Sequence, residues 1–242
     1  MSLLGLISAG WLIFIALLVL VGLANLILGS QTYALWRFTK MASALGLSYD
    51  PEAKAFPLPG CERLPVWQVW KAHRNLLHGT VAGVETIFVE VGKEGAIEDS
   101  IMSDVFHGLV CFRQPGRSLP AFQLISHYGS PEKALDDTAR ARPKDFHQVE
   151  LQGNPGFPNF FLLLASPKED EGALRDLFPR PVQDFFMEHR DFFGLRDVQG
   201  AGEWVGVMER IDFVGGAKAF REELALVRRV HELFARATGQ DH

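Results

Sequence analysis

The first 36 residues contain no Asp, Glu, Lys or Arg, and this uncharged stretch constrains the fold more than any other feature. Within it, residues 3–29 are apolar apart from Ser8, Asn25 and small glycines. A helix of that length rises about 40 Å, more than the roughly 30 Å hydrocarbon thickness of a bilayer, so it can span with tilt. We therefore predict a membrane anchor over residues 1–30, with the lipid bilayer contacted through residues 3–29.

The charges that follow the anchor predict its orientation. Arg37 and Lys40 come after the apolar run and no Lys or Arg precedes it, so the positive-inside rule places the C-terminal part in the cytoplasm. Trp11, Tyr33 and Trp36 are placed as interfacial aromatics would be. A cleaved signal peptide is the alternative, but it would have a basic start, a shorter apolar core and an A-x-A site. We predict a single-pass protein of the cell membrane.

Beyond the anchor the composition is that of an ordinary folded domain. About 200 residues remain, which suits one domain, and no second apolar span occurs. The net charge is −5 and basic residues are scattered among acids, so nucleic acid is not an expected partner. Cys61 and Cys111 lie fifty residues apart without CxxC spacing, which excludes a zinc site built from cysteines and predicts two buried, reduced thiols.

We divide the chain after residue 30 into three parts. Residues 31–48 have apolar side chains at helical spacing and predict a juxtamembrane helix, whose apolar face (Tyr33, Trp36, Met41, Ala44 and Leu45) packs on the domain rather than on lipid. Residues 49–65 are rich in proline and predict an extended connector, after which the core begins. Residues 66–242 predict a soluble α+β domain.

Short apolar runs rich in β-branched and aromatic residues predict strands. They cover residues 66–70, 81–91, 105–112, 121–125, 160–165, 204–208 and 211–214. Two of these runs, 105–112 and 160–165, are apolar on both alternations, so both faces of the strands should be covered. Turn residues at 92–95 and 115–116 separate successive strands. Links this short cannot form the crossover that parallel strands need, which predicts a mainly antiparallel sheet in which successive strands are neighbours.

Capping signals predict three short helices and a long one. Ser130 with Pro131, and Ser166 with Pro167 and Glu169, mark two helix starts, and residues 181–187 form another short piece. Residues 217–237 predict an amphipathic helix of five turns. Its apolar stripe consists of Phe220, Leu224, Val227, Val230 and Phe234.

Three motifs could indicate chemistry. His189, Arg190 and Asp191 match the kinase catalytic-loop tripeptide, but the following Asn and the nucleotide-binding parts are missing, so we expect a solvated helix end. Residues 200–206 (GAGEWVG) precede a strand instead of a helix, which predicts a hairpin turn and not a phosphate loop. Residues 153–158 (GNPGFP) are predicted to be a loop between strands, with a binding rim as the alternative.

No spacing among the titratable residues predicts a catalytic or metal site. The eight histidines contain no i, i+4 pair, and His73 and His78 are expected in a turn. Ser103 and Ser126 lack the G-x-S-x-G elbow of serine hydrolases. The single acids considered are Glu85, Glu90 and Asp99. We therefore assign no catalytic, cofactor-binding or metal-ligating residue and expect no cofactor.

Several phrases of the sequence resemble a group of uncharacterised bacterial membrane-anchored proteins with no assigned activity. They are residues 44–51 (ALGLSYDP), 75–79 (NLLHG), 119–124 (LPAFQL), 145–147 (DFH), the helix at 170–178, and 203–208 (EWVGVM). The resemblance extends over nearly all of the chain beyond the anchor. It implies a bacterial membrane protein and transfers no functional residue.

From these observations the sequence favours a non-catalytic domain held at the membrane, which binds a protein partner, a ligand or the membrane surface. Two alternatives stay open: a membrane-tethered enzyme whose site is assembled from dispersed residues, and a structural subunit of an envelope complex. In the last case Gly5, Ala9 and Gly22 of the anchor would mediate helix association.

Overall fold

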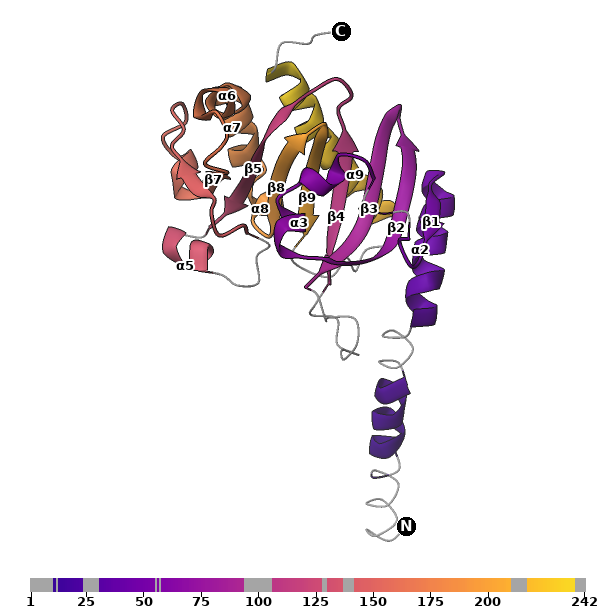
Figure 1. The fold of residues 1–242 in the computed structure, drawn as a ribbon. Coiled ribbons are helices and arrows are strands. Elements are labelled where there is room, and N and C mark those ends of the chain that lie inside the picture. The colour runs from indigo at the N-terminus through magenta and orange to yellow at the C-terminus, as the bar shows by residue number, and fades with distance from the viewer. Residues whose placement is uncertain are drawn as a thin grey trace.

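The computed structural model describes residues 11, 13–23, 31–54, 56, 58–93, 106–127, 130–136, 142–209 and 217–237 (Figure 1). Nine strands of the described chain form one sheet in the order β1-β2-β3-β4-β9-β8-β5-β7-β6. All eight neighbouring pairs are antiparallel. The predicted α+β class and the antiparallel sheet are confirmed.

The strands are β1 (Ser48–Asp50), β2 (Ala72–Val81), β3 (Val84–Gly92), β4 (Phe106–Arg113), β5 (Leu119–Ser126), β6 (His147–Val149), β7 (Phe161–Ala165), β8 (Arg196–Gly202) and β9 (Trp204–Glu209). The helices are α2 (Gln31–Leu45), α3 (Val66–Val69), α5 (Pro131–Asp136), α6 (Glu171–Leu177), α7 (Arg180–Glu188), α8 (Arg190–Phe193) and α9 (Ala217–Ala237), with two 3₁₀ turns, η1 (Cys61–Arg63) and η2 (Phe157–Asn159).

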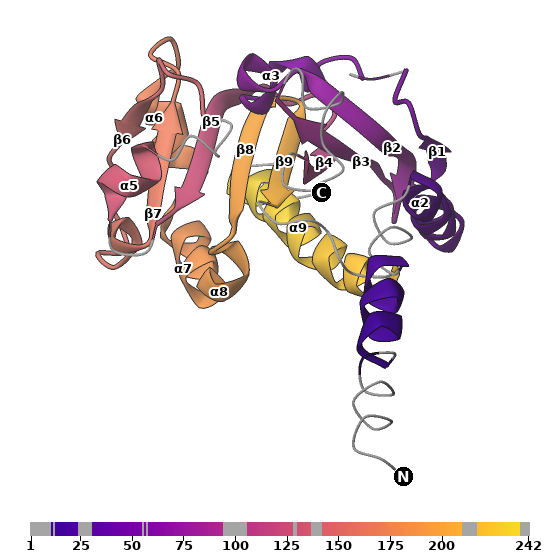
Figure 2. The ribbon, with the colours of Figure 1, turned by 90° about the horizontal axis from the view of Figure 1, so that it is seen from below.

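Both faces of the central strands are buried, as the apolar runs predict. In β4, Val110 and Phe112 face a large core beneath α2, α7 and α9, whereas Leu109 and Cys111 face a second cluster on the opposite side. Figure 2 shows α9 and α7 on one side of the sheet and α3 on the other. The two layers of cover explain why these strands have no polar alternation.

Helix α9 matches its predicted range, and its apolar stripe is almost fully buried. The stripe residues are 0–4% exposed, and α9 contacts α2, α6 and α7 as well as β4. Arg117, in the loop after β4, donates hydrogen bonds to the carbonyl oxygens of Phe234 and Ala235 at 3.2 and 2.7 Å. A cation at the C-terminal carbonyls of a helix is favourable, because it satisfies acceptors and complements the dipole.

The predicted strand at residues 66–70 is wrong, because this segment forms α3. The backbone N–H of Val66 donates to Oε1 of the buried Gln199 in β8 at 2.9 Å, and Trp70 N–H returns to Val66 O. Val66 and Trp70 are 0% and 1% exposed. Packing on the outer face of the sheet overrides the strand preference of the valines and tryptophans.

The prediction that the core begins after the connector is also wrong. Ser48–Asp50 pair with β2, and the side chains of Ala53, Phe56 and Cys61 lie in the second core cluster. Prolines and glycines shape the backbone here, but the apolar side chains between them cover one face of the sheet. This segment is therefore an integral layer of the domain.

The link between β4 and β5 also differs from the prediction. The Pro115–Gly116 turn does not join neighbouring strands, since β9 and β8 lie between β4 and β5. Three strand spacings amount to about 14 Å, which the five residues 114–118 can bridge when extended.

The helix predicted to start at Ser166 begins instead at Glu171, where Asp170 caps it by accepting a hydrogen bond from Gly172 N–H at 2.8 Å.

Four strands were not predicted from the sequence: β1, β2, β6 and β8. His73 and His78 lie in β2 and not in a turn. The glycine-rich residues 200–206 do form a hairpin, as predicted, with β8 ending at Gly202 and β9 starting at Trp204. Predicted helices at 131 and 181–187 correspond to α5 and α7. The predicted strand 211–214 lies outside the described residues.

Candidate functional site

Trp11 and residues 13–23 are helical, and this segment lies away from the sheet in both views (Figures 1 and 2). Its large apolar side chains are 51–64% exposed. Within the described ranges, none of the helices combines the length and the apolarity needed to cross a membrane. The remainder of the predicted span, including Gly5 and Ala9, lies outside those ranges. The transmembrane helix, the bilayer contact through residues 3–29 and the cytoplasmic orientation therefore stay predictions.

The next described helix, α2, packs on the sheet through one side. Phe38, Met41 and Ala42 are 0%, 1% and 5% exposed, at the i, i+3, i+4 spacing of a single helix face. The Phe38 ring stacks 5.9 Å from Tyr49 in β1 and lies 5.6 Å from Phe88 in β3. The helix therefore packs on the domain, as expected.

The prediction of which side chains of this helix are buried was only partly right. Met41 is buried and Leu45 packs against the core, but Trp36 is 56% exposed and Ala44 is exposed as well. A step of 100° per residue places Trp36 about 160° from Phe38 and about 140° from Met41, whereas Ala44, about 60° from Met41, lies at the edge of the packed face. The Tyr33 side chain lies outside the described part.

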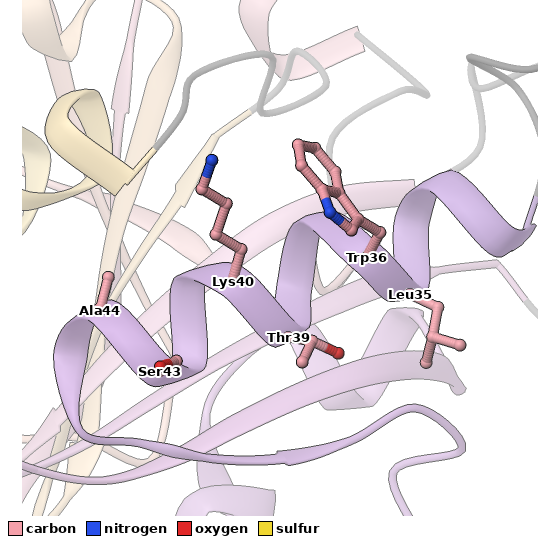
Figure 3. A pocket seen from close by; sticks show the side chains of 6 residues that line it. All are labelled: Leu35, Trp36, Thr39, Lys40, Ser43 and Ala44. Carbon is pink, nitrogen blue, oxygen red and sulfur yellow. The ribbon is translucent and has the colours of Figure 1, made fainter.

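Six residues on the other side form what we term the outer face of α2. They line a shallow hollow of about 570 Å³ (Figure 3) and are Leu35, Trp36, Thr39, Lys40, Ser43 and Ala44. Leu35 is 47% exposed, and the Lys40 ammonium lies 5.0 Å from the centroid of the Trp36 ring, one helical turn before it. An exposed tryptophan and leucine beside a lysine make an amphipathic surface rather than an ordinary solvated one.

A polar network anchors α2 to the neighbouring strands. Glu90 in β3 accepts hydrogen bonds from Arg37 Nη2 at 3.4 Å, Arg74 Nε at 2.8 Å and Asn75 Nδ2 at 2.8 Å. Tyr49 donates its hydroxyl to Asn75 Oδ1 at 2.7 Å. Arg37, one of the two cations on which the orientation prediction rests, is thus paired with a carboxylate.

The environment of Tyr49 disfavours its ionised form. Burial, and to a smaller extent the nearby Glu90 carboxylate, raise the pKa of Tyr49 to about 12, against the opposing effects of Arg37 and Arg74. The phenol is therefore a neutral donor at physiological pH, and the network needs that proton to hold Asn75. Asn75 has a φ of 55°, at an irregularity in the β2–β3 register.

The acids and the serine that the sequence analysis considered have structural partners. Glu85 accepts from Arg113 at 3.0 Å, and Arg113 also pairs with Glu203. Ser126 is buried and donates to Gly194 O at 2.6 Å. Ser103 and Asp99 lie outside the described residues. The structure does not bring Glu85, Glu90 and Ser126 together.

The loop at residues 153–158 is packed rather than open. The fully buried Gln183 of α7 donates through Nε2 to the carbonyls of Gln152 and Phe178 at 2.9 and 2.8 Å, and accepts from Asn154 N–H at 3.0 Å. Gly153 has a φ of 140°, and a Cβ there would meet the Gln183 amide nitrogen at 2.9 Å. Gln183 carried no motif that would have identified it from the sequence.

Histidines and cysteines are dispersed. No group of three or more His, Cys, Asp or Glu side chains capable of holding a metal occurs in the described part of the chain. His189 begins the short α8 as a helix junction, with Nδ1 2.9 Å from Phe185 O. Cys61 and Cys111 are free, buried thiols, as predicted, and burial and the adjacent Cys61 raise the pKa of Cys111.

The outer face of α2 was not predicted as a site. Trp36 and Ala44 were expected on the packed face, Trp36 also as an interfacial aromatic, and Lys40 only as an orienting charge. A signal for it was present, since Phe38, Met41, Ala42 and Leu45 follow the i, i+3, i+4, i+7 pattern of a buried stripe. With that stripe facing inward, Thr39 and Ser43 fall on the outward side, whereas Leu35, seven positions before Ala42, falls beside the stripe, so only the tertiary structure reveals its exposure.

Together the fold and this surface define a class: an α+β domain on one antiparallel sheet, preceded by an exposed apolar helical segment. The structure is similar to a crystal structure of the mycobacterial trehalose monomycolate transport factor A, TtfA, with a TM-score of 0.51 and 14% sequence identity, over 83% of this chain and 93% of that chain. No protein-family model and no curated protein matches the sequence, which agrees with its resemblance to proteins of no assigned activity. At 14% identity the likeness shows a shared fold and nothing about a shared function.

Proposed function

We propose that this chain is a membrane-tethered, non-catalytic accessory domain of a transport system, held at the cytoplasmic face of the cell membrane. The observation that carries the proposal is the helical segment at residues 13–23, whose large apolar side chains are more than half exposed. Apolar surface of this extent has a high free energy in water and marks a segment that contacts lipid or protein.

The arrangement of polar groups supports a binding role over a catalytic one. Glu85, Glu90 and Ser126 form hydrogen bonds that join secondary-structure elements, and Gln183 holds a loop. Each of these groups has a protein partner, and the bonds position backbone and helices, which is a structural use of the side chains.

The link to transport comes from the fold. TtfA, which is named as a transport factor, has a similar fold over most of both chains. A fold hosts many functions, so this likeness is an analogy that ranks transport above other membrane processes and does not identify a cargo.

Membrane tethering is tested by fractionating bacterial cells that produce the full chain. Leu17 and Val21 lie one turn apart in the exposed segment and are each 56% exposed. We expect the unmodified protein in the carbonate-resistant membrane pellet. Substituting both with lysine should release it, because each lysine costs about 2.5–3.5 kcal/mol near a bilayer centre. The Leu17→Ala, Val21→Ala variant is the matched control and should stay in the pellet. Recovery of the unmodified protein in the supernatant would refute the tether.

The role in transport needs a separate readout. Deleting the gene should alter the distribution of an exported envelope lipid or solute, measured by metabolic labelling of intact and extracted cells. The full chain should restore the distribution, and the double-lysine variant should not. Identical distributions in the parent and deletion strains would overturn the transport role while leaving the tether intact.

A further inference from the structure

We propose that the outer face of α2 lies in the headgroup layer of the bilayer and contacts anionic phospholipid, with Trp36 and Lys40 as its main contacts. This inference rests on the proposed tether and adds a second, specific membrane contact. This second contact would hold the domain against the membrane surface in one orientation.

The setting of α2 about its own axis directs the outer face away from the domain. Phe38 and Met41 are inserted in the core, and Arg37 is paired with Glu90 in β3. Turning Trp36 inward would require the loss of both contacts. The exposed Leu35 and Trp36 therefore cannot be covered by a rotation of the helix, and they remain available to the bilayer surface.

The position of Trp36 along the chain fits a lipid headgroup. Trp36 lies seven positions after residue 29, where the predicted span ends, so it is at most about 10 Å beyond the hydrocarbon along a helix, and nearer when the helix is tilted. The headgroup layer on each side of the hydrocarbon core is about 5–8 Å thick. Tryptophan prefers this layer, because its ring is apolar and its indole N–H is a donor.

Lys40 and Trp36 extend from the same side of α2 (Figure 3). The Lys40 ammonium lies 5.0 Å from the centroid of the Trp36 ring, so a cation and an aromatic ring form one continuous surface. The headgroup layer accommodates both groups, because it offers phosphate to the ammonium and a partly apolar environment to the ring.

The composition of the hollow favours lipid over protein as the occupant. Among the described residues, its lining includes one cation, the hydroxyls of Thr39 and Ser43 and no carboxylate, and its large apolar side chains, Leu35 and Trp36, lie at the end near the apolar segment. Polarity thus rises with distance from the predicted anchor, as it does across a leaflet. A phosphate-bearing headgroup satisfies the ammonium and the hydroxyls together.

The experiment measures tryptophan quenching by brominated lipids, with the full chain reconstituted in vesicles. Trp67, Trp70 and Trp204 are 7%, 1% and 1% exposed, so Trp11 and Trp36 are the exposed tryptophans among the described residues. In Trp11→Phe protein, we expect stronger quenching by bromines near the headgroup than by bromines at the chain end. The Trp11→Phe, Trp36→Phe variant supplies the baseline and should lose this quenching.

The lysine is tested in the same assay. Phosphatidylcholine vesicles with phosphatidylglycerol should quench Trp36 more than vesicles of phosphatidylcholine alone, and Lys40→Gln should abolish that difference. Lys40→Arg keeps the charge and should retain it. Equal quenching in both lipids for the unmodified lysine would overturn the part of the proposal that assigns an anionic lipid.

Failure of this inference is distinguishable from failure of the tether. Quenching of Trp11 in the Trp36→Phe variant, together with an unquenched Trp36 in the Trp11→Phe variant, would overturn the headgroup contact and support the tether. No quenching of either would overturn both. Because Cys61 and Cys111 are buried, Ser43→Cys introduces an accessible thiol. A disulfide-linked dimer of that variant in vesicles, with Trp36 unquenched, would assign the face to a second copy and refute the lipid.

Discussion

Arg37 of α2 and Glu90 of β3 form an ion pair at 3.4 Å across 53 residues of sequence, and their side chains are only 21% and 13% exposed. The pair joins a helix to the sheet beside a hydrophobic contact, so it limits rotation of the helix about its axis. The orientation of the outer face of α2 depends on it.

The first prediction concerns this network. Glu90→Gln removes the charge that Arg37, Arg74 and Asn75 share, and we expect it to lower the free energy of unfolding by about 1–3 kcal/mol, because two arginines lose a half-buried partner. Urea denaturation monitored by circular dichroism measures the change. Glu52→Gln is the control, since the Glu52–Lys54 pair is solvent-exposed and should contribute nothing measurable. Equal midpoints for the two variants would contradict the structural role of Glu90.

The second prediction is spectroscopic. The pKa of Tyr49 is raised to about 12, so this phenol should ionise about two units later in the folded protein than in denaturant. Absorbance at alkaline pH reports tyrosinate directly, and the chain has three tyrosines. Tyr49→Phe should remove the late step. A raised acid pKa contributes stability that is complete below pH 10 and is lost as the pH rises through 12. Ionisation of Tyr49 at its ordinary pKa in the folded protein would be inconsistent with its burial.

A third prediction follows from His231 of α9. Burial lowers its pKa below the usual 6.5, against a weaker opposing effect of the Arg113 carbonyl, which lies 3.2 Å from Nε2. The unfolded chain therefore binds the proton more tightly, and stability should be complete above about pH 6.5 and fall as the pH decreases. Thermal melts of the unmodified protein and of His231→Asn at several pH values test this. A melting temperature with the same pH slope in both proteins would rule out His231 as its source.

The fourth prediction concerns the loop held by Gln183. Gln183→Ala should destabilise the domain by about 2–4 kcal/mol, because it leaves the carbonyls of Gln152 and Phe178 and the Asn154 N–H without their buried partner. Hydrogen exchange of residues 152–158 should increase selectively. Gln148 in the edge strand β6 is exposed, and Gln148→Ala should change neither measurement. Unchanged exchange in Gln183→Ala would show that the loop is held by other contacts.

Elements with strong local periodicity could be predicted from sequence. The stripe of α9 and the apolar runs of β4 and β7 are long enough for the period of the side chains to identify the element. Residues 66–70 failed because β-branched and aromatic residues suit either a strand or a buried turn of helix, and the hydrogen bond from Val66 to Gln199 decides between them. The start of α6 failed because Ser166 and Asp170 are both acceptable caps.

At the candidate site, too, features set by neighbouring residues could be predicted and features set by distant contacts could not. The sequence by itself determined that the N-terminal stretch is apolar and uncharged, that a helix follows it and that a long amphipathic helix ends the fold, since each depends on side chains close together in the chain. Only the tertiary structure decided that β9 and β8 lie between β4 and β5, and that α2 turns Phe38 inward and Trp36 outward. These features depend on contacts such as Arg37 with Glu90, whose partners are far apart in sequence and meet only when the sheet is assembled.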